Sequence, residues 1–212
     1  MDALYAAGFR MMSPAHFTDT AIGGSAAGAT KADSPLGCAW VKQMEARGML
    51  IDVSHASPHA IRDVTSLAIE PVVVSPTGVK GVCSNNRNLT DDQLRAVAAT
   101  AGVIGVGFRE VATCGTDANA IASAILYTAH VVGAEHAALG PNFDGAVTEP
   151  FDSSGLALIT EALLQQGASE HDIRLVRGEN VARAPSEVLP QQQRAFDRCE
   201  PSSGHWQHVQ VP

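Results

Sequence analysis

The segment Met49–His55 carries the residues that are best suited to chemistry. It is an apolar run that ends on the carboxylate of Asp52 and the imidazole of His55, just before a helix start at Ser57 and Pro58. In parallel α/β proteins, catalytic and metal-binding residues gather at the carboxyl ends of strands. The pattern therefore predicts that Asp52 and His55 belong to a metal site or an acid/base site.

The neighbouring strand ends offer fewer groups of this kind. The run Val72–Ser75 ends on Pro76, and the run Ala137–Gly140 leads through one proline to Asn142. Proline has no side-chain donor, and zinc sites use Cys, His, Asp and Glu rather than amides. Metal ligands that could act with His55 are therefore missing where the next strands should supply them.

Short apolar runs alternate along the whole chain with segments of helical length. The predicted strands are residues 8–13, 49–53, 72–75, 103–108 and 137–140. Helix starts are indicated by Ser34 before Pro35, by Ser57 before Pro58 and by a capping box from Thr90 to Gln93. Further helices are predicted over 118–132 and 156–164, with stops at Gly133 and Gly167.

This alternation, with strands that lack polar residues at every second position, predicts a parallel sheet covered by helices. A doubly wound sheet and a (β/α) barrel both fit the pattern. A dinucleotide-binding doubly wound fold needs a glycine-rich turn directly after a strand, and the glycine-rich stretch 23–28 does not follow one. We interpret that stretch as a flexible loop.

Composition and charge limit the classes of partner. The 212 residues are 45% apolar and 17% charged, which suits one domain with a sizeable core. The 14 Lys and Arg against 22 Asp and Glu give a net charge of −8. This argues against nucleic acid and anionic membranes as partners, because phosphate groups need a basic face. A small neutral or cationic ligand stays open.

Four cysteines, at positions 38, 83, 114 and 199, form no CxxC pair, so we expect reduced thiols. Residues 1–17 have no basic leading segment, and no stretch approaches the ~18 apolar residues of a membrane span. We therefore expect a cytoplasmic protein. After Ala184 the chain becomes rich in Pro, Gln and Ser, which predicts a domain over 1–184 and a poorly ordered tail over 185–212.

From Met1 to about Ala184 the chain resembles the C-terminal part of the membrane dipeptidase (renal dipeptidase) family. The resemblance is carried, in order and spacing, by the phrases DALY with Gly8, GMLIDVSH at 48–55, PVVVS at 71–75, RNLTDD at 87–92 and FDG at 143–145. Each phrase is weak by itself, and together they are specific. The family contains binuclear zinc hydrolases on a (β/α)₈ barrel. The resemblance thus implies a partial TIM-type barrel covering about the last five strand–helix units.

The same resemblance implies roles for three residues. His55 would be a zinc ligand, bound as neutral imidazole. His16 would stabilise the oxyanion of the tetrahedral intermediate, and Arg87 would bind the substrate carboxylate as a planar bidentate donor. The implied reaction is hydrolysis of a dipeptide by a metal-bound hydroxide. From the residues alone, His55 fits a hydrogen-bonded strand-end histidine equally well, His16 an ordinary loop histidine, and Arg87 better fits a surface arginine.

Two positions depart from the family pattern. Pro76 stands where the family has the second histidine ligand of the zinc held by His55, and Asn142 stands where it has the acid/base aspartate. An amide cannot take a proton at neutral pH, so the general base is lost. Asp144 remains a candidate catalytic carboxylate. The family's His-x-Asp pair and bridging glutamate belong to a half that precedes Met1. We therefore expect zinc to bind weakly or not at all, and hydrolysis by this chain alone to be impaired.

The remaining histidines do not repair this site: His59, His130 and His171 are expected at exposed helix positions, His136 in a turn, and His205 and His208 in the tail. The alternative function is a non-catalytic remnant, or a subunit that pairs with another half-barrel, because an unclosed sheet leaves two unpaired edges. The expected partners are a dipeptide and either a second copy or a complementing N-terminal half, with no nucleic acid and no membrane.

Overall fold

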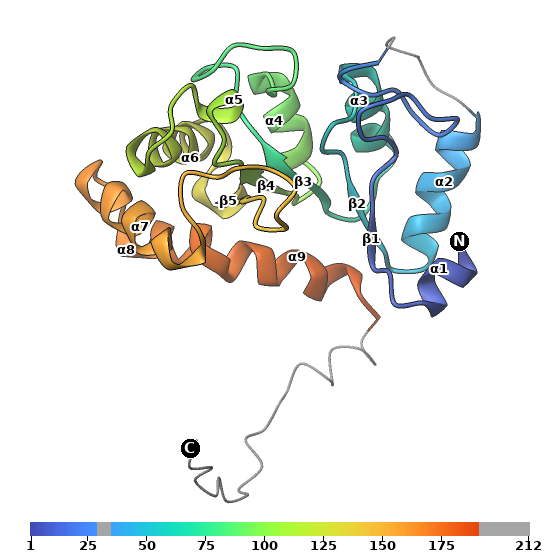
Figure 1. Ribbon diagram of the computed structural model, residues 1–212. Helices are drawn as coiled ribbons and strands as arrows, with labels where there is room; N and C mark the ends of the chain where they lie inside the picture. The colour runs from blue at the N-terminus through green and yellow to red at the C-terminus, as the bar shows by residue number, and fades with distance from the viewer. Residues whose placement is uncertain (29–34, 191–212) are drawn as a thin grey trace, which may run out of the picture.

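The computed structural model describes residues 1–28 and 35–190. It contains a five-stranded sheet in the order β1-β2-β3-β4-β5, and every neighbouring pair is parallel. The strands are β1 Met11–Met12, β2 Leu50–Asp52, β3 Val72–Thr77, β4 Val103–Val106 and β5 Ala137–Leu139 (Figure 1). All five predicted strands are confirmed. The α/β class is therefore also confirmed.

Helices connect successive strands and return the chain to the same end of the sheet, which makes the strands parallel. The α-helices are α1 Asp2–Ala6, α2 Pro35–Ala46, α3 Pro58–Leu67, α4 Asp91–Ala98, α5 Glu110–Thr113, α6 Ala118–Val132, α7 Leu156–Gln165, α8 Glu170–Arg174 and α9 Asn180–Val188. Single turns at Ala134–His136, Ser153–Gly155 and Leu175–Glu179 complete the regular structure. The stretch 23–28 contains no helix or named strand, as expected for a loop.

Local capping signals explain where the helices begin. The hydroxyl of Ser57 accepts a hydrogen bond from the backbone N–H of Ala60, and Pro58 opens α3. Both bonds of the capping box between Thr90 and Gln93 are present at α4. These two predicted starts are confirmed, because each side chain satisfies an amide that the first helical turn leaves free. Helix α2 begins at Pro35 as predicted, whereas its expected cap, Ser34, lies outside the described residues.

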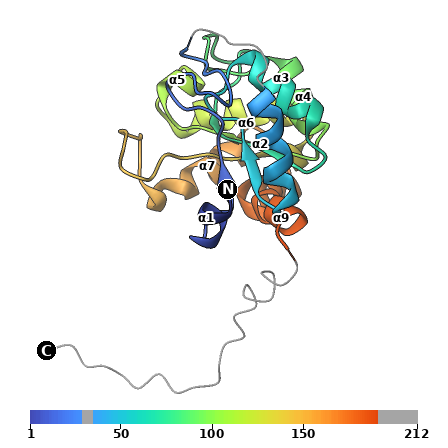
Figure 2. The same cartoon turned by 90° about the vertical axis from the view of Figure 1, so that its right-hand side faces the viewer.

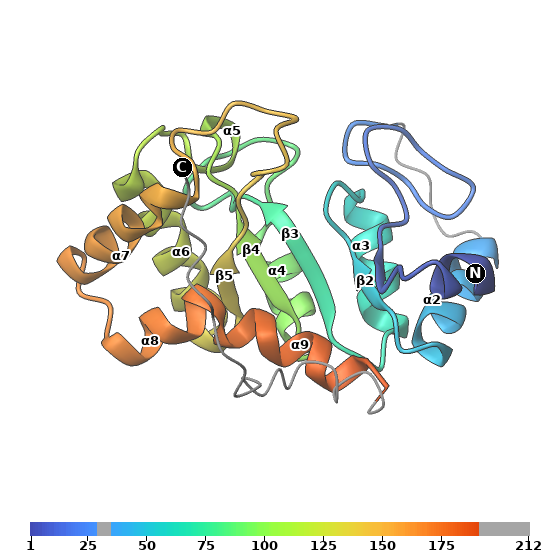
Figure 3. The ribbon, with the colours of Figure 1, turned by 60° about the horizontal axis from the view of Figure 1, so that its bottom comes forward.

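The two faces of the sheet are covered by different helices. Ile51, Val74 and Ile104 pack in the main hydrophobic core with α2, α3, α4, α6 and α7. The alternate strand residues, Leu50, Val73, Val103 and Ala138, pack with Ala184 and Val188 of α9. Figure 3 shows α4 and α9 on opposite sides of the sheet. Because strand side chains alternate between faces, this double coverage explains the absence of polar alternation in the strands.

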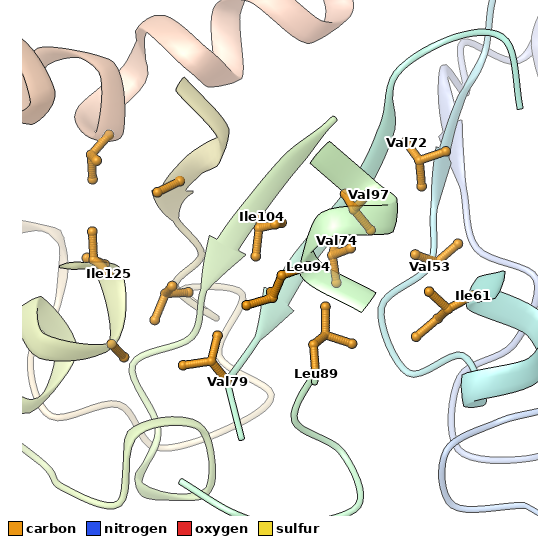
Figure 4. Packing of buried hydrophobic residues seen from close by; sticks show 14 of the residues in the cluster. Val53, Ile61, Val72, Val74, Val79, Leu89, Leu94, Val97, Ile104 and Ile125 are labelled. Carbon is orange, nitrogen blue, oxygen red and sulfur yellow. The ribbon is translucent and has the colours of Figure 1, made fainter. Parts of the chain in front are cut away.

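Helix α4 anchors the centre of the main core. Figure 4 shows Leu94 and Val97 of α4 lying against Val74 and Ile104 of β3 and β4. All four side chains are buried, and full burial of an aliphatic side chain is worth roughly 1.5–3 kcal/mol. This packing holds the carboxyl ends of β3 and β4 in place. The loops that leave β1 and β3 lie at the top of Figures 1 and 2, and α9 lies toward the bottom.

The C-terminal helix runs past the predicted domain boundary at Ala184. Helix α9 continues through Pro185 to Val188, because Val188 is buried against the sheet. A locally polar, proline-containing segment is thus kept helical by its tertiary contacts. The rest of the predicted tail, from Gln191 to Pro212, lies outside the described residues.

The expectation of reduced thiols is wrong for Cys83 and Cys114, which form a disulfide with a sequence separation of 31 residues. No short motif links these positions, so the sequence offered no signal for the pairing. Cys38 is free. Disulfides are typical of oxidising compartments, so this bond counts against the cytoplasmic location, which stays a prediction. Within 1–28 and 35–190, no helix has the length and apolar character needed to cross a membrane.

Candidate functional site

A cavity of about 380 Å³ lies at the carboxyl end of the sheet, and segments that follow all five strands line it. It brings together the residues that the sequence singled out for binding, catalysis or loss of function: His16, His55, Pro76, Arg87, Asn142 and Asp144. We refer to this space as the strand-end cavity. Pro76 and Asn142 therefore border the same cavity as His55.

Asp52 does not line the strand-end cavity, although the sequence pattern placed it in a site with His55. Its Oδ1 atom accepts hydrogen bonds from the backbone N–H of Ser54 at 2.8 Å and from the Ser54 hydroxyl at 2.7 Å. The backbone N–H of Ser75 donates to Ser54 Oγ at 2.6 Å. Burial raises the pKa of Asp52, and the hydrogen bonds from Ser54 and Ser75 oppose that shift. The carboxylate therefore ties the end of β2 to β3.

His55 sits directly after this network, in the left-handed backbone region with φ of 62°. Such a conformation is unusual for a residue other than glycine and recurs at functional sites, where the surrounding structure holds it. The ring centroid of His16 lies 4.2 Å from that of His55, and the ring of Phe17 also contacts His55. The two histidines thus share one aromatic cluster at the rim of the strand-end cavity.

His55 is a neutral imidazole at physiological pH. Burial, followed by the positive charge of Arg87 and the proximity of His16, lowers the pKa of His55 from 6.5 to about 4. Nη2 of Arg87 lies 3.3 Å from Nε2 of His55. Because a guanidinium only donates, Nε2 is the acceptor and the proton is on Nδ1. Neutral imidazole is the form that binds metals, but here its Nε2 is engaged by Arg87.

One end of the Arg87 guanidinium is held by two contacts. Its Nη2 atom also donates to the carbonyl oxygen of Pro76 at 3.0 Å, while no hydrogen bond joins its Nε or Nη1 to another described residue. The Arg87 backbone N–H donates to Asn85 Oδ1 at 2.9 Å. Burial, followed by the like charge of Arg109, lowers the pKa of Arg87. Half of the guanidinium is therefore positioned and half remains available for a ligand.

The loop that carries Arg87 is fastened to the loop after β4. Nδ2 of the buried Asn88 donates to the carbonyl oxygens of Cys83 at 2.7 Å and Ala112 at 3.1 Å. The Cys83–Cys114 disulfide joins the same two loops. These contacts hold Arg87 at the mouth of the strand-end cavity.

Two charged residues near this cavity were not predicted from the sequence to belong to the site. Arg109 lines it from the end of β4, and Glu149 lies close to Arg109 and to the backbone amide of Asn142. Both carboxylate oxygens of Glu149 are buried without a well-formed hydrogen bond, and burial raises its pKa. Neither residue belongs to a family phrase. The strand-end rule that selected His55 could have found Arg109, which follows Phe108 at the end of a predicted strand.

The donor set does not fit a zinc pair. Within the described ranges, no three His, Cys, Asp or Glu side chains lie close enough together to hold a metal ion. A catalytic zinc uses about three protein ligands, and a pair needs a bridging carboxylate. Around His55 the strand-end cavity offers Pro76 and Asn142, and Arg87 brings positive charge to the ring nitrogen.

The other described histidines lie away from this cavity. His59, His130 and His171 are exposed on α3, α6 and α8, as expected. Nδ1 of His136 lies 2.8 Å from the carbonyl oxygen of Gly102, just before β4. His205 and His208 lie outside the described residues.

Comparison with known proteins gives a family match over most of the chain. Residues 1–196 match the family model described as membrane dipeptidase (peptidase family M19). An uncharacterised protein in the pqqA 5′ region of Klebsiella pneumoniae is 32% identical over 186 residues, covering 81% of this chain and 68% of that protein. Dipeptidase aclJ of Aspergillus oryzae is 31% identical over 163 residues, covering 73% of this chain and 39% of that protein.

Two solved structures share the fold. A metallopeptidase from Rhodobacter sphaeroides, liganded with a phosphinate mimic of the dipeptide L-Ala-D-Ala, superposes with a TM-score of 0.79 at 23% identity, covering 89% of this chain and 58% of that one. The probable dipeptidase PvdM from Pseudomonas aeruginosa has a TM-score of 0.80 at 22% identity, covering 88% and 64%. The chain therefore spans only part of the length of these relatives. The likeness in fold agrees with the expected partial barrel.

Proposed function

Because the chain belongs to the membrane dipeptidase family, peptidase family M19, we propose that its strand-end cavity binds dipeptides and that zinc-dependent hydrolysis by these 212 residues is impaired. Family membership supports the dipeptidase-like part of the proposal. Peptide binding with impaired hydrolysis is supported by one observation: Arg87, Pro76 and Asn142 line the same cavity. The substrate-binding position is kept in that cavity, while two positions needed for chemistry are changed.

Arg87 is the proposed anchor for the free carboxylate of the dipeptide. Its contacts with His55 and Pro76 use Nη2, and they leave Nε and Nη1 without a hydrogen bond to another described residue, so either atom can donate to a carboxylate. A charge-assisted hydrogen bond of this kind is roughly twice as strong as a hydrogen bond between neutral groups. Partial burial of the guanidinium strengthens the pair further, because less water competes for the charge.

His16 is the proposed donor to the carbonyl oxygen of the scissile bond. Its ring packs against those of Phe17 and His55 at the rim of the cavity, which limits the directions in which its N–H can point. A preorganised donor at this place would stabilise negative charge that develops on the oxygen. The same contact would orient a bound peptide when no hydrolysis takes place.

The general base is the weak part of the site. Asn142 cannot accept a proton from water at neutral pH. Asp144, the proposed substitute, is exposed, and its Oδ1 atom accepts a hydrogen bond from the backbone N–H of Ala146 at 3.1 Å. A solvated carboxylate on the rim would be a poor replacement for one held inside the cavity, so we propose slow or absent turnover.

Metal analysis and peptide binding together test this proposal. We expect the purified chain to hold less than about half a zinc ion in zinc-replete buffer, against two for a binuclear centre. It should bind alanylalanine without hydrolysing it, and Arg87→Gln should weaken binding about tenfold or more. Arg177→Gln, which removes an exposed charge between α8 and α9, is the matched control. Two zinc ions per chain with rapid turnover would contradict the proposed impairment.

The second candidate is a subunit that pairs with a complementing half-barrel. Strands β1 and β5 are the two edges of the sheet in the described part of the chain, and the relatives are longer than this chain. An apolar cavity of about 330 Å³ lies on the face covered by α9, between Leu50, Val103, Ala138 and Pro185. Exposed edges and apolar hollows of this kind favour association.

Size-exclusion chromatography with light scattering tests the pairing. If the chain needs a partner, we expect self-association or aggregation when it is alone, and a defined complex when the matching N-terminal part of a longer relative is added. A well-dispersed monomer with a cooperative thermal transition would count against the second candidate and leave the first unaffected.

A further inference from the structure

We infer that Arg109 is a second anion-binding residue of the strand-end cavity and makes it prefer dipeptides with an acidic side chain. The ligand class is therefore a small peptide with two carboxylates, one for Arg87 and one for Arg109. This inference rests on the proposed binding of dipeptides through Arg87 and adds the chemical class of the ligand.

The first argument is the place of Arg109. It follows Phe108 after β4, the strand between β3, which carries Pro76, and β5, which precedes Asn142. Its side chain is exposed and lines the same cavity as Arg87. Within the described ranges, no hydrogen bond and no ion pair closer than 4.0 Å engages its guanidinium. Arg109 is thus able to bind a ligand without breaking a contact.

The second argument is the charge balance of the cavity. Its lining contains two guanidinium groups and one carboxylate, that of Asp144, although the whole chain has a net charge of −8. Arg109 is close enough to Arg87 that its charge adds to burial in lowering the Arg87 pKa. Two like charges repel each other at this range, and an anion bound between them relieves the repulsion. The cavity therefore favours ligands with more than one negative charge.

The third argument is the shape of the surroundings. A second cavity, of about 740 Å³, adjoins the first, and Arg109 and Val111 line both. A dipeptide anchored by Arg87 could extend one side chain toward the second cavity. The carboxylate of an acidic side chain would then meet Arg109 at the boundary, while the amide of a glutamine side chain would present no charge to it.

Glu149 should reduce the preference for acidic dipeptides. It also lines the second cavity, and the charge of Arg109 lowers its pKa against the larger effect of burial. The two side chains do not form an ion pair within 4.0 Å, yet the Glu149 charge competes with a ligand carboxylate for Arg109. We therefore expect Glu149→Gln to strengthen the binding of acidic dipeptides.

Calorimetric titration of the full chain with matched peptides tests the inference. The pairs are alanylglutamate with alanylglutamine, and glutamylalanine with glutaminylalanine, each differing only by a carboxylate in place of an amide. In at least one pair, the wild-type chain should bind the acidic peptide about tenfold more tightly. Arg109→Gln should abolish this difference without weakening the binding of the neutral peptide. Arg177→Gln should preserve the difference, because it makes the same charge change elsewhere.

The outcomes separate this inference from the proposed function. Equal affinity within both pairs, or a preference that survives in Arg109→Gln, overturns the role of Arg109, and binding that still depends on Arg87 then leaves the proposed function standing. Failure of all four peptides to bind the wild-type chain overturns both. Thermal transitions of each variant confirm folding, which an exposed side chain such as Arg109 is not expected to affect.

Discussion

Nη2 of Arg87 donates a hydrogen bond to Nε2 of His55 across 3.3 Å. The residue proposed to hold the substrate carboxylate thus also engages one of the two ring nitrogens through which a histidine can bind a metal ion. A cation could reach this nitrogen only by displacing the guanidinium, which is itself positively charged. The contact joins His55 directly to the arginine that we propose as the anchor for the substrate carboxylate.

The stability of the chain should fall when His55 is protonated. The folded-state pKa of about 4 lies below the unfolded value of 6.5, so the unfolded state takes up the proton first. The contribution of His55 to the free energy of unfolding is fully present above pH 6.5 and is lost as the pH falls through 4. The shift corresponds to about 3 kcal/mol, which solvent screening of the half-buried ring reduces to about 1–2 kcal/mol.

Urea unfolding from pH 7 to 3.5, in buffer with a chelator, measures this effect. His55→Asn is the reference variant, because asparagine tolerates the positive φ at this position. The difference in unfolding free energy between the two proteins should shrink over this pH range. A difference independent of pH would show that burial does not perturb His55.

Removal of the neighbouring charge should raise the pKa of His55. Burial is the larger cause of the depressed value and Arg87 the second, so Arg87→Gln should move the pKa upward while leaving it below 6.5. Titration of the imidazole resonances by NMR gives the value. Arg95→Gln on α4, which removes a charge paired with Asp91 and Asp92, should leave the His55 pKa unchanged.

Zinc binding should return when ligands are restored. The double variant Pro76→His and Asn142→Asp adds an imidazole and a carboxylate to the cavity that contains His55, giving the three ligands of a catalytic zinc site. We expect uptake to rise from less than half to about one zinc ion per chain after dialysis, measured by mass spectrometry. Pro76→Ala with Asn142→Ala is the control. No gain in the first variant would mean that the two positions do not flank one metal site.

The disulfide should stabilise the fold and the Arg87 loop together. Cys83→Ser with Cys114→Ser should lower the free energy of unfolding by about 4 kcal/mol, as expected for a closed loop of this length. Peptide binding should weaken as well, because the same bond joins the two loops that flank the cavity. Urea unfolding and calorimetry measure the two effects. Cys38→Ser should change neither, since Cys38 forms no disulfide.

The capping box at α4 should contribute measurably to stability. Thr90→Ala removes the hydroxyl that accepts from the backbone N–H of Gln93, and should cost about 1 kcal/mol. Thr90→Ser keeps the hydroxyl and should retain most of that stability. Equal losses in both variants would show that the effect comes from the lost methyl group rather than the cap.

Local patterns in the sequence were sufficient for most of the framework. The five strands follow from apolar runs, and the starts of α3 and α4 follow from Ser57, Pro58 and Thr90. These signals are readable because capping and hydrophobic burial act between residues only a few positions apart. The resemblance to the dipeptidase family added expected roles for residues that follow the strands. The comparisons confirmed the family and the fold.

Contacts between distant segments were beyond such patterns. The sequence could not pair Cys83 with Cys114 and did not indicate the packing of α9 on the sheet. It also could not show that the Asp52 carboxylate accepts hydrogen bonds from Ser54 and Ser75. Arg109 belongs to no family phrase, and only its position after a predicted strand pointed to the site.

The sequence by itself determined which helices and strands form and which residue types stand at the ends of the strands. Only the tertiary structure decided that Arg87 donates a hydrogen bond to Nε2 of His55, that Arg109 lines the same cavity, and that Asp52 has a structural role. The reason is physical: hydrogen bonding, burial and charge act over a few ångströms in space, and folding alone brings together side chains that lie tens of residues apart in the chain.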